Sequence, residues 1–335
     1  MLSLATAASA LVVAPSSRVV AIGDLHGDIR ATVRTLTFAG IIDEQQRWAG
    51  GDTTLVQLGD ILDRGDSEYE CWTLLQQLKA EAPAAGGQVV TLCGNHEVMN
   101  VLGRAGPFIH ALGHTAFGPD RVMAWAPGGK LAKQLAEFPV IAIVGDSVFV
   151  HAALPADATH ENIEYINSET RAWLLGERFE PPSFMWGGEG SPIWDRCLSS
   201  PSGLEPHADD CKALRTALDR LGVARVVVGH TPQRTVNCAC DGAVWRCDTG
   251  MSQWVVGGAC EALEITSDGV RILSECDPFL NPDGCNVESG VVTPTASKAA
   301  PLTECDEDGC EDIFPEEDET PTSAGADKSW IEGFL

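Results

Sequence analysis

The chain has 335 residues and a formal net charge of −26, from 22 basic and 48 acidic side chains. Hydrophobic residues make up 44% of it, which is enough for a sizeable core and excludes a wholly disordered or fibrous protein. The negative charge repels phosphate backbones, so nucleic acid is not an expected partner. No apolar run approaches the roughly 20 residues that cross a bilayer, so the sequence predicts no transmembrane segment.

Three regions differ in composition along the chain. Residues 1–17 lack acidic residues but also lack any Lys or Arg before Arg18, which predicts a leader or disordered N-terminus with a weak targeting signal. Residues 18–280 alternate between strand and helix patterns and are expected to form one domain. Residues 281–335 are rich in Pro, Ser, Thr and acid, which predicts a disordered acidic tail. We expect a soluble protein of the cytoplasm or an organelle.

The first hundred residues repeat a strand, loop and helix pattern. A β-branched run at residues 18–22 ends at a glycine, and helical spacing follows over residues 28–38. The same order recurs with a strand at 54–58 before a helix at 67–79, and with a strand at 88–93 before another helical stretch. This repetition predicts a parallel sheet with right-handed crossovers, whose functional loops lie at the carboxyl ends of the strands.

A hairpin opens the second half of the predicted domain. Residues 139–144 and 147–150 are apolar runs separated by Gly145 and Asp146, a hairpin turn signal. The elements predicted after it are a helix at 161–176, a Pro/Gly/Trp-rich loop at 181–196, a helix at 209–221, and strands at 224–228, 243–247 and 262–266.

Ten of the 12 cysteines lie from Cys197 onward. Cys238, Cys240 and Cys247 are close in sequence, as are Cys305 and Cys310 in the predicted tail. The spacing is compatible with one or two disulfides in an oxidising compartment and equally with buried free thiols.

Polar side chains follow five of the predicted strands, where a loop would need only a turn residue. They are Asp24, His26, Asp60, Asp63, Arg64, Asn95, His96, Glu97, His151 and His230. Taken singly, each is explained by a helix cap, a loop hydrogen bond or a surface ion pair. Taken together, Asp, Asn and His without Cys suit hard or borderline cations, and one shared carboxylate would allow two ions about 3.5–4 Å apart. The surplus positive charge of two such ions would attract an anionic substrate.

Four ordered blocks resemble the signature of the phosphoprotein phosphatases, in the calcineurin-like metallophosphoesterase superfamily. They are GDLHG at 23–27, GDILDRG at 59–65, GNHE at 94–97 and GH at 229–230. Four further stretches are similar to its Shewanella-like branch: GNHEVMN at 94–100, INSETRAWL at 166–174, VGHTPQ at 228–233 and CDGAVWRCDTGM at 240–251. The resemblance covers roughly residues 18 to 275 and implies an α/β fold, a four-layer α/β/β/α sandwich, with residues 18–280 as a single catalytic domain.

The resemblance also implies a role for each matched residue. The first metal would be held by Asp24, His26 and Asp60, and the second by Asp60, Asn95, His151 and His230. Arg64 and Asn95 would bind the phosphoryl oxygens, together with Arg196, which matches through Trp194-Asp195-Arg196 in a variable loop. His96 would protonate the leaving group while Asp63 holds its imidazole. The ions would be divalent or trivalent transition metals, namely manganese, iron or both, with zinc as a further candidate.

The function implied is that of a dimetal phosphatase acting on phosphomonoesters by direct attack of a metal-bridging hydroxide. Its substrate would be a small phosphoester or a protein phosphorylated on Ser/Thr or Tyr. Asp248-Thr249-Gly250 also resembles a motif of dinucleoside-polyphosphate hydrolases, which keeps that activity as an alternative. A noncatalytic phosphate-binding or scaffold relative is another, because Ala153 stands where the family usually has glycine. If that position needs a positive φ, Ala153 should slightly distort His151.

Deletion of residues 281–335 should change neither activity nor the thermal unfolding midpoint appreciably. The segment has too few apolar residues to pack and too much like charge to fold alone. Circular dichroism melts of the full and truncated chains provide the measurement. Unfolding of the truncated chain would show that the boundary is misplaced or that Cys285 is bridged to the domain.

Overall fold

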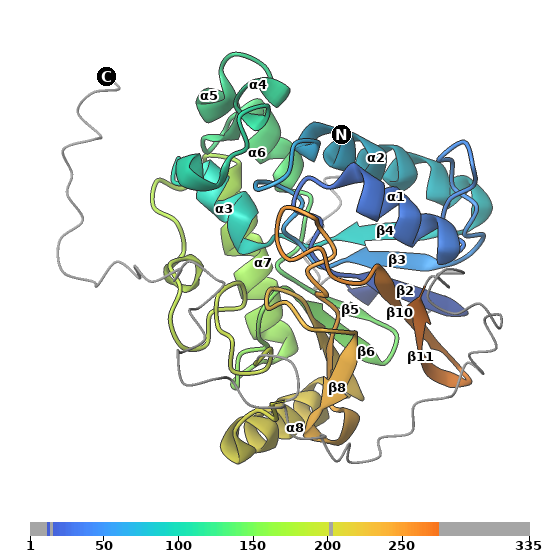
Figure 1. Cartoon of the computed structure of the whole chain (residues 1–335). Coiled ribbons are helices and arrows are strands. Elements are labelled where there is room, and N and C mark those ends of the chain that lie inside the picture. The colour runs from blue at the N-terminus through green and yellow to red at the C-terminus, as the bar shows by residue number, and fades with distance from the viewer. Residues whose placement is uncertain (1–11, 14–15, 201–203, 275–335) are drawn as a thin grey trace, which may run out of the picture.

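The computed structural model describes residues 12–13, 16–200 and 204–274 (Figure 1). The predicted acidic tail lies outside the described residues, as does most of the predicted leader. Within that leader, Val12–Val13 form strand β1, which pairs in parallel with Ile143 and Val144.

The first sheet has five strands in the order β11-β10-β2-β3-β4. Strands β2 (Arg18–Ile22), β3 (Thr54–Gln57) and β4 (Gln88–Thr91) run parallel, and β10 (Glu261–Thr266) and β11 (Gly269–Ser274) add an antiparallel edge. Helices α1 (Ile29–Phe38), α2 (Glu68–Glu81) and α3 (Asn95–Val101) follow the three parallel strands in turn. The three strand and helix units predicted from the sequence are therefore present.

The second sheet has six strands in the order β1-β5-β6-β7-β9-β8. Strands β5 (Ile141–Val144) and β6 (Ser147–Val150) form the predicted hairpin. Strands β7 (Arg225–Val228) and β9 (Val244–Arg246) continue in parallel with β6, and β8 (Asn237–Ala239) closes the edge. Helices α7 (His160–Leu174) and α8 (Ala208–Leu221) come from the chain between β6 and β7.

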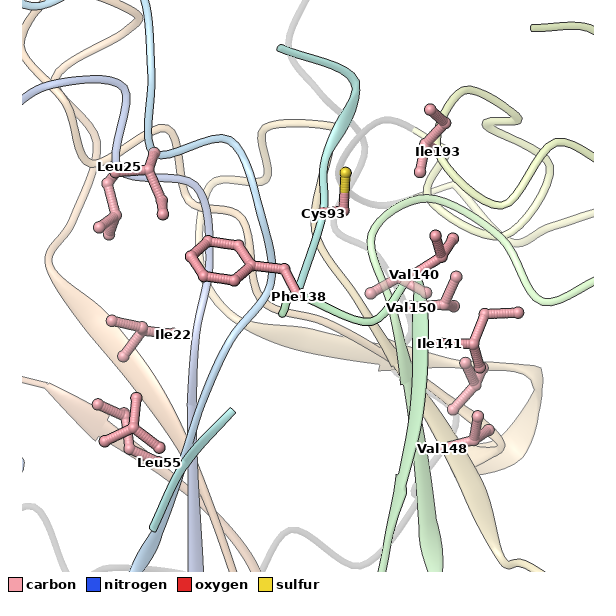
Figure 2. Packing of buried hydrophobic residues seen from close by; sticks show 14 of the residues in the cluster. Ile22, Leu25, Leu55, Cys93, Phe138, Val140, Ile141, Val148, Val150 and Ile193 are labelled. Carbon is pink, nitrogen blue, oxygen red and sulfur yellow. The ribbon is translucent and has the colours of Figure 1, made fainter. Parts of the chain in front are cut away.

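Alternate side chains along the strands point to opposite buried faces, and one of these faces stacks the two sheets against each other. In β2, Val19 and Ala21 join a core cluster that also contains Ala142 and Phe149 of the other sheet. The intervening residues of both sheets pack outward with the apolar faces of the helices. Figure 2 shows this division, with Ile22 and Leu55 on one side and Ile141, Val148 and Val150 on the other. Because side chains alternate along a strand, the layer order is α/β/β/α, as expected.

Short helices fill the remaining connections, and the sequence patterns did not predict them. Between β4 and β5 lie η2 (Gly106–Phe108), α4 (Gly113–Ala116), α5 (Arg121–Trp125) and α6 (Lys130–Leu135); elsewhere are η1 (Ala82–Ala85), η3 (Ser183–Met185) and η4 (Cys240–Gly242). Among the helices in the described part of the chain, none is both long and apolar enough to cross a membrane.

A disulfide joins Cys211 in α8 to Cys240 in η4. The sequence placed Cys240 among closely spaced cysteines, but its partner is 29 residues away and not one of those neighbours. Cys238 and Cys247 are free thiols. The pair Cys305 and Cys310 lies outside the described residues.

Candidate active site

The polar residues predicted to meet at the strand ends do converge on one buried site. Asp24 and His26 follow β2, Asp60 and Asp63 follow β3, Asn95 and His96 follow β4, His151 follows β6 and His230 follows β7. All of these side chains are buried. The two stacked sheets therefore deliver carboxylate, amide and imidazole groups to a common edge.

The loop after β3 has a strained backbone. Asp60, Asp63 and Arg64 have φ values of 54°, 67° and 64°, in the left-handed region that side chains rarely adopt. Such strain persists only where surrounding structure overdetermines it. Gly94 approaches this loop so closely that a Cβ there would collide with Asp60 Oδ1, so only glycine fits.

Glu97 holds the strained loop through four backbone N–H groups. Its Oε2 accepts from the amides of Asp60 (2.8 Å) and Gly94 (2.9 Å), and its Oε1 accepts from those of Ile61 (2.9 Å) and Leu62 (3.3 Å). The sequence marked Glu97 within the GNHE block but gave it no role. A carboxylate suits this position because both of its oxygens accept hydrogen bonds.

Glu97→Gln should lower the free energy of unfolding by about 2–6 kcal/mol, since the amide nitrogen cannot accept from two of the four buried N–H groups and each loss costs about 1–3 kcal/mol. Urea unfolding measures the change. Glu137→Gln, at an exposed ion pair with Arg171, is the control and should alter stability little. Equal stability of Glu97→Gln and the native chain would show that this carboxylate does not hold the loop.

Asp60 lies between two groups of imidazoles. Its Oδ2 is 3.4 Å from His151 Nε2 and 3.8 Å from His26 Nε2. Two sets of side chains share Asp60, and within each set the potential ligand atoms all lie within 4.8 Å of one another. One set is His26, Asp60 and His96, and the other is Asp60, His151 and His230. Asn95 adds its Oδ1 to the second set, 2.9 Å from His151 Nε2.

Asp24 belongs to neither set. Its Oδ1 accepts a hydrogen bond of 3.2 Å from the backbone N–H of His230, so it lies at the border of the second set. His96, which the sequence assigns only to proton transfer, is itself a member of the first set. Both sets nevertheless combine nitrogen and oxygen donors around a shared carboxylate, which fits two borderline cations.

The electrostatics of the site also fit a cation. Burial raises the pKa of Asp24, and the carboxylates of Asp248 and Asp60 raise it further. Burial alone would raise the pKa of Asp60, but the imidazoles of His151 and His96 outweigh it and hold this pKa well below its ordinary value. Asp60 and Asp24 in turn raise the pKa of His151 to about 10, against the effect of burial. A bound cation would relieve the repulsion among these buried carboxylates.

The His96 imidazole is held from behind by a carboxylate. His96 Nδ1 lies 2.8 Å from Asp63 Oδ2, and the contact leaves Nε2 for a substrate. Burial lowers the pKa of His96, but Asp60 and Asp63 outweigh this effect and raise it above the ordinary value. A raised pKa keeps the imidazole protonated, as a proton donor requires.

The two arginines are placed on different sides of the site. The Arg64 guanidinium lies over the Phe108 ring, 5.3 Å from its centroid, and that ring also meets His96 edge to face. Arg196 Nη1 donates to the carbonyl of His230 (3.1 Å) and to Thr231 Oγ1 (2.8 Å). The loop at 181–196 thus brings Arg196 beside the second ligand set.

The distortion expected at Ala153 is absent. Ala153 is buried and is not among the described non-glycine residues with positive φ, so the premise of strain there was wrong. The His151 ring keeps both of its contacts, at 2.7 Å to the carbonyl of Leu58 and 2.9 Å to Asn95. The substitution therefore gives no reason to exclude this histidine from the site.

Family comparison agrees with the geometry. Residues 17–234 match the calcineurin-like phosphoesterase family, and the chain belongs to that family. Membership implies a hydrolase with two metal ions.

Its relatives include Shewanella-like protein phosphatases, which confirms the resemblance drawn from the sequence. The chain is 36% identical over 308 residues to Shewanella-like protein phosphatase 2 of Arabidopsis thaliana, covering 77% of each. It is 28% identical to Shewanella-like protein phosphatase 1 of Plasmodium berghei, covering 71% of this chain and 68% of that one. A solved cold-active protein-tyrosine phosphatase of a psychrophilic Shewanella species superposes with a TM-score of 0.63 at 25% identity, covering 78% of this chain and 79% of the other.

Proposed function

We propose that the protein is a dimetal phosphatase that hydrolyses phosphomonoesters of proteins, on Ser/Thr or on Tyr. The observation that carries this proposal is Asp60, a carboxylate shared by two imidazole sets, with the His96 and Asp63 pair directly beside it. The phosphatase names of its relatives support the substrate class.

The donor sets and the family resemblance together assign the ligands of the two ions, and Asp24 is assigned to the first ion through the resemblance alone. Asp24, His26 and Asp60 would hold one ion, and the other would be held by Asp60, Asn95, His151 and His230. Manganese, iron and zinc all suit such mixed oxygen and nitrogen donors. When bound, the two ions supply positive charge for the phosphoryl oxygens and a water of lowered pKa as nucleophile.

The remaining residues bind the substrate and move a proton. Arg64 and Arg196 would hold the phosphoryl oxygens with planar guanidinium donors, assisted by the Asn95 amide. His96 would donate its Nε2 proton to the departing oxygen, because an alkoxide is a poor leaving group. Asp63 keeps the imidazole in the tautomer and orientation that this transfer requires.

The observed contacts do not favour the alternative activities. Asp248, part of the motif shared with dinucleoside-polyphosphate hydrolases, is buried and accepts from the backbone N–H of Gly250 at 2.7 Å. That role stabilises a turn. A noncatalytic scaffold would have no need of so complete a set of buried ligands.

Hydrolysis of a phosphopeptide panel by protein loaded with Mn²⁺ tests the proposal. We expect phosphate release from phosphoserine, phosphothreonine or phosphotyrosine peptides, and little from diadenosine tetraphosphate. Preferential cleavage of the tetraphosphate would contradict the assignment. Phosphate binding without turnover would instead indicate a scaffold.

A further inference from the structure

A buried polar network lies behind the His96 and Asp63 pair, and its centre is Arg121 of α5. The side chain of Arg121 is only 5% exposed. Its guanidinium donates to Asn100 Oδ1 at 2.7 Å, to Glu68 Oε2 at 3.1 Å and to the carbonyl of Gly113 at 2.7 Å. A buried guanidinium with so many partners is fixed in position, because each lost partner would leave a costly unsatisfied donor.

Three members of this network, Asn100, Glu68 and Arg121, contact Asp63. Asn100 Nδ2 donates to both Asp63 oxygens at 3.0 Å and to the carbonyl of His96 at 2.9 Å. Glu68 Oε2 accepts from the Asp63 backbone N–H at 3.0 Å. Arg121 Nη2 itself lies 3.4 Å from Asp63 Oδ1. The strained Asp63 is therefore held at its backbone and at both carboxylate oxygens.

Hydrogen-bond polarity gives Arg121 control over the orientation of Asn100. Arginine can only donate, so the Asn100 oxygen must face Arg121 and its nitrogen must face Asp63. If the amide turned over, its oxygen would point at a carboxylate and repel it. Because the Asp63 carboxylate in turn accepts from His96 Nδ1, the orientation of the imidazole depends on Arg121 through two intermediates.

We propose that Arg121 is a positioning residue for proton transfer, acting through Asn100 and Glu68 on Asp63 and His96. The inference rests on the proposed phosphatase function and goes beyond it by naming residues outside the signature blocks. None of the hydrogen-bond partners that the structure gives Arg121 is a proposed metal or phosphate ligand. Its loss should therefore matter most when the leaving group needs a proton.

The test compares two substrates in the full chain loaded with Mn²⁺. Arg121→Met should lower turnover of a phosphoserine peptide by about 10–100-fold, the scale of a displaced catalytic group, and that of p-nitrophenyl phosphate by less than about 3-fold. Metal content should stay unchanged. Arg18→Met is the matched control, because Arg18 likewise binds a buried Glu264 and a backbone carbonyl but lies at the start of β2, at the other end of that strand from the site. It should not change the ratio of the two rates.

A second comparison uses His96→Asn as background. Adding Arg121→Met to it should cause no further loss on the phosphoserine peptide, since the residue acts through His96. If the single variant fails to fold because Glu68 is left charged and buried, the pair Glu68→Gln with Arg121→Met removes both charges and should show the same substrate dependence.

Equal losses on both substrates, or additive losses with His96→Asn, would overturn the positioning role. Failure of the proposed function is distinguishable, because the unmodified chain would then release no phosphate from either substrate.

Discussion

Asp60→Asn should lower phosphatase turnover by on the order of 10³-fold and reduce the metal bound by the purified protein. The reason is that one carboxylate lies within reach of both imidazole sets, and its charge would hold two cations together. Asp24→Asn should have a smaller effect, because Asp24 would contact one ion whereas Asp60 would contact both.

Elemental analysis and steady-state kinetics of the same preparation provide the measurement. Asp146→Asn is a suitable control, since that exposed carboxylate pairs with Arg225 away from the site. Native metal content and turnover in Asp60→Asn would overturn its assignment as the shared ligand.

His96→Asn should retain both metals and phosphate binding but lose about 10²–10⁴-fold in turnover of alkyl phosphomonoesters, the usual scale for a general acid. The loss should shrink for p-nitrophenyl phosphate, whose leaving group needs little protonation. The 2.8 Å contact with Asp63 and the raised pKa of His96 are the structural grounds for this expectation.

His160→Asn, an exposed substitution at the start of α7, controls for the loss of an imidazole. Equal losses of His96→Asn on alkyl and aryl esters would assign His96 a binding role. A loss of metal would instead place it among the ligands, as its nearness to His26 and Asp60 allows.

The sequence patterns predict most strands and the site loops because their signals are local, whereas the stacking of two sheets is implied only by the family resemblance. Strands such as β2 and β3 alternate between two buried faces, and each is followed within two residues by a glycine and then a polar residue. Parallel strands bring such ends together whatever the details of the connections. The sequence is therefore sufficient to name the candidate ligands.

The supporting network could not be predicted, because its contacts are distant in sequence and its helices are short. Arg121 is 53 residues from Glu68 and 58 from Asp63. Helix α5 has five residues and is stabilised by tertiary packing of Trp125, so local propensity gives little signal. The partner of Cys240 was missed for the same reason, since α8 and η4 meet only in the folded chain.

The most direct test of the central claim is metal content measured together with phosphomonoester turnover before and after chelation. We predict two equivalents of transition metal per chain, loss of p-nitrophenyl phosphate hydrolysis when a chelator removes them, and recovery on addition of Mn²⁺. Undiminished hydrolysis by the metal-free protein would contradict a dimetal site at Asp60, and two bound equivalents without any hydrolysis would contradict a phosphatase.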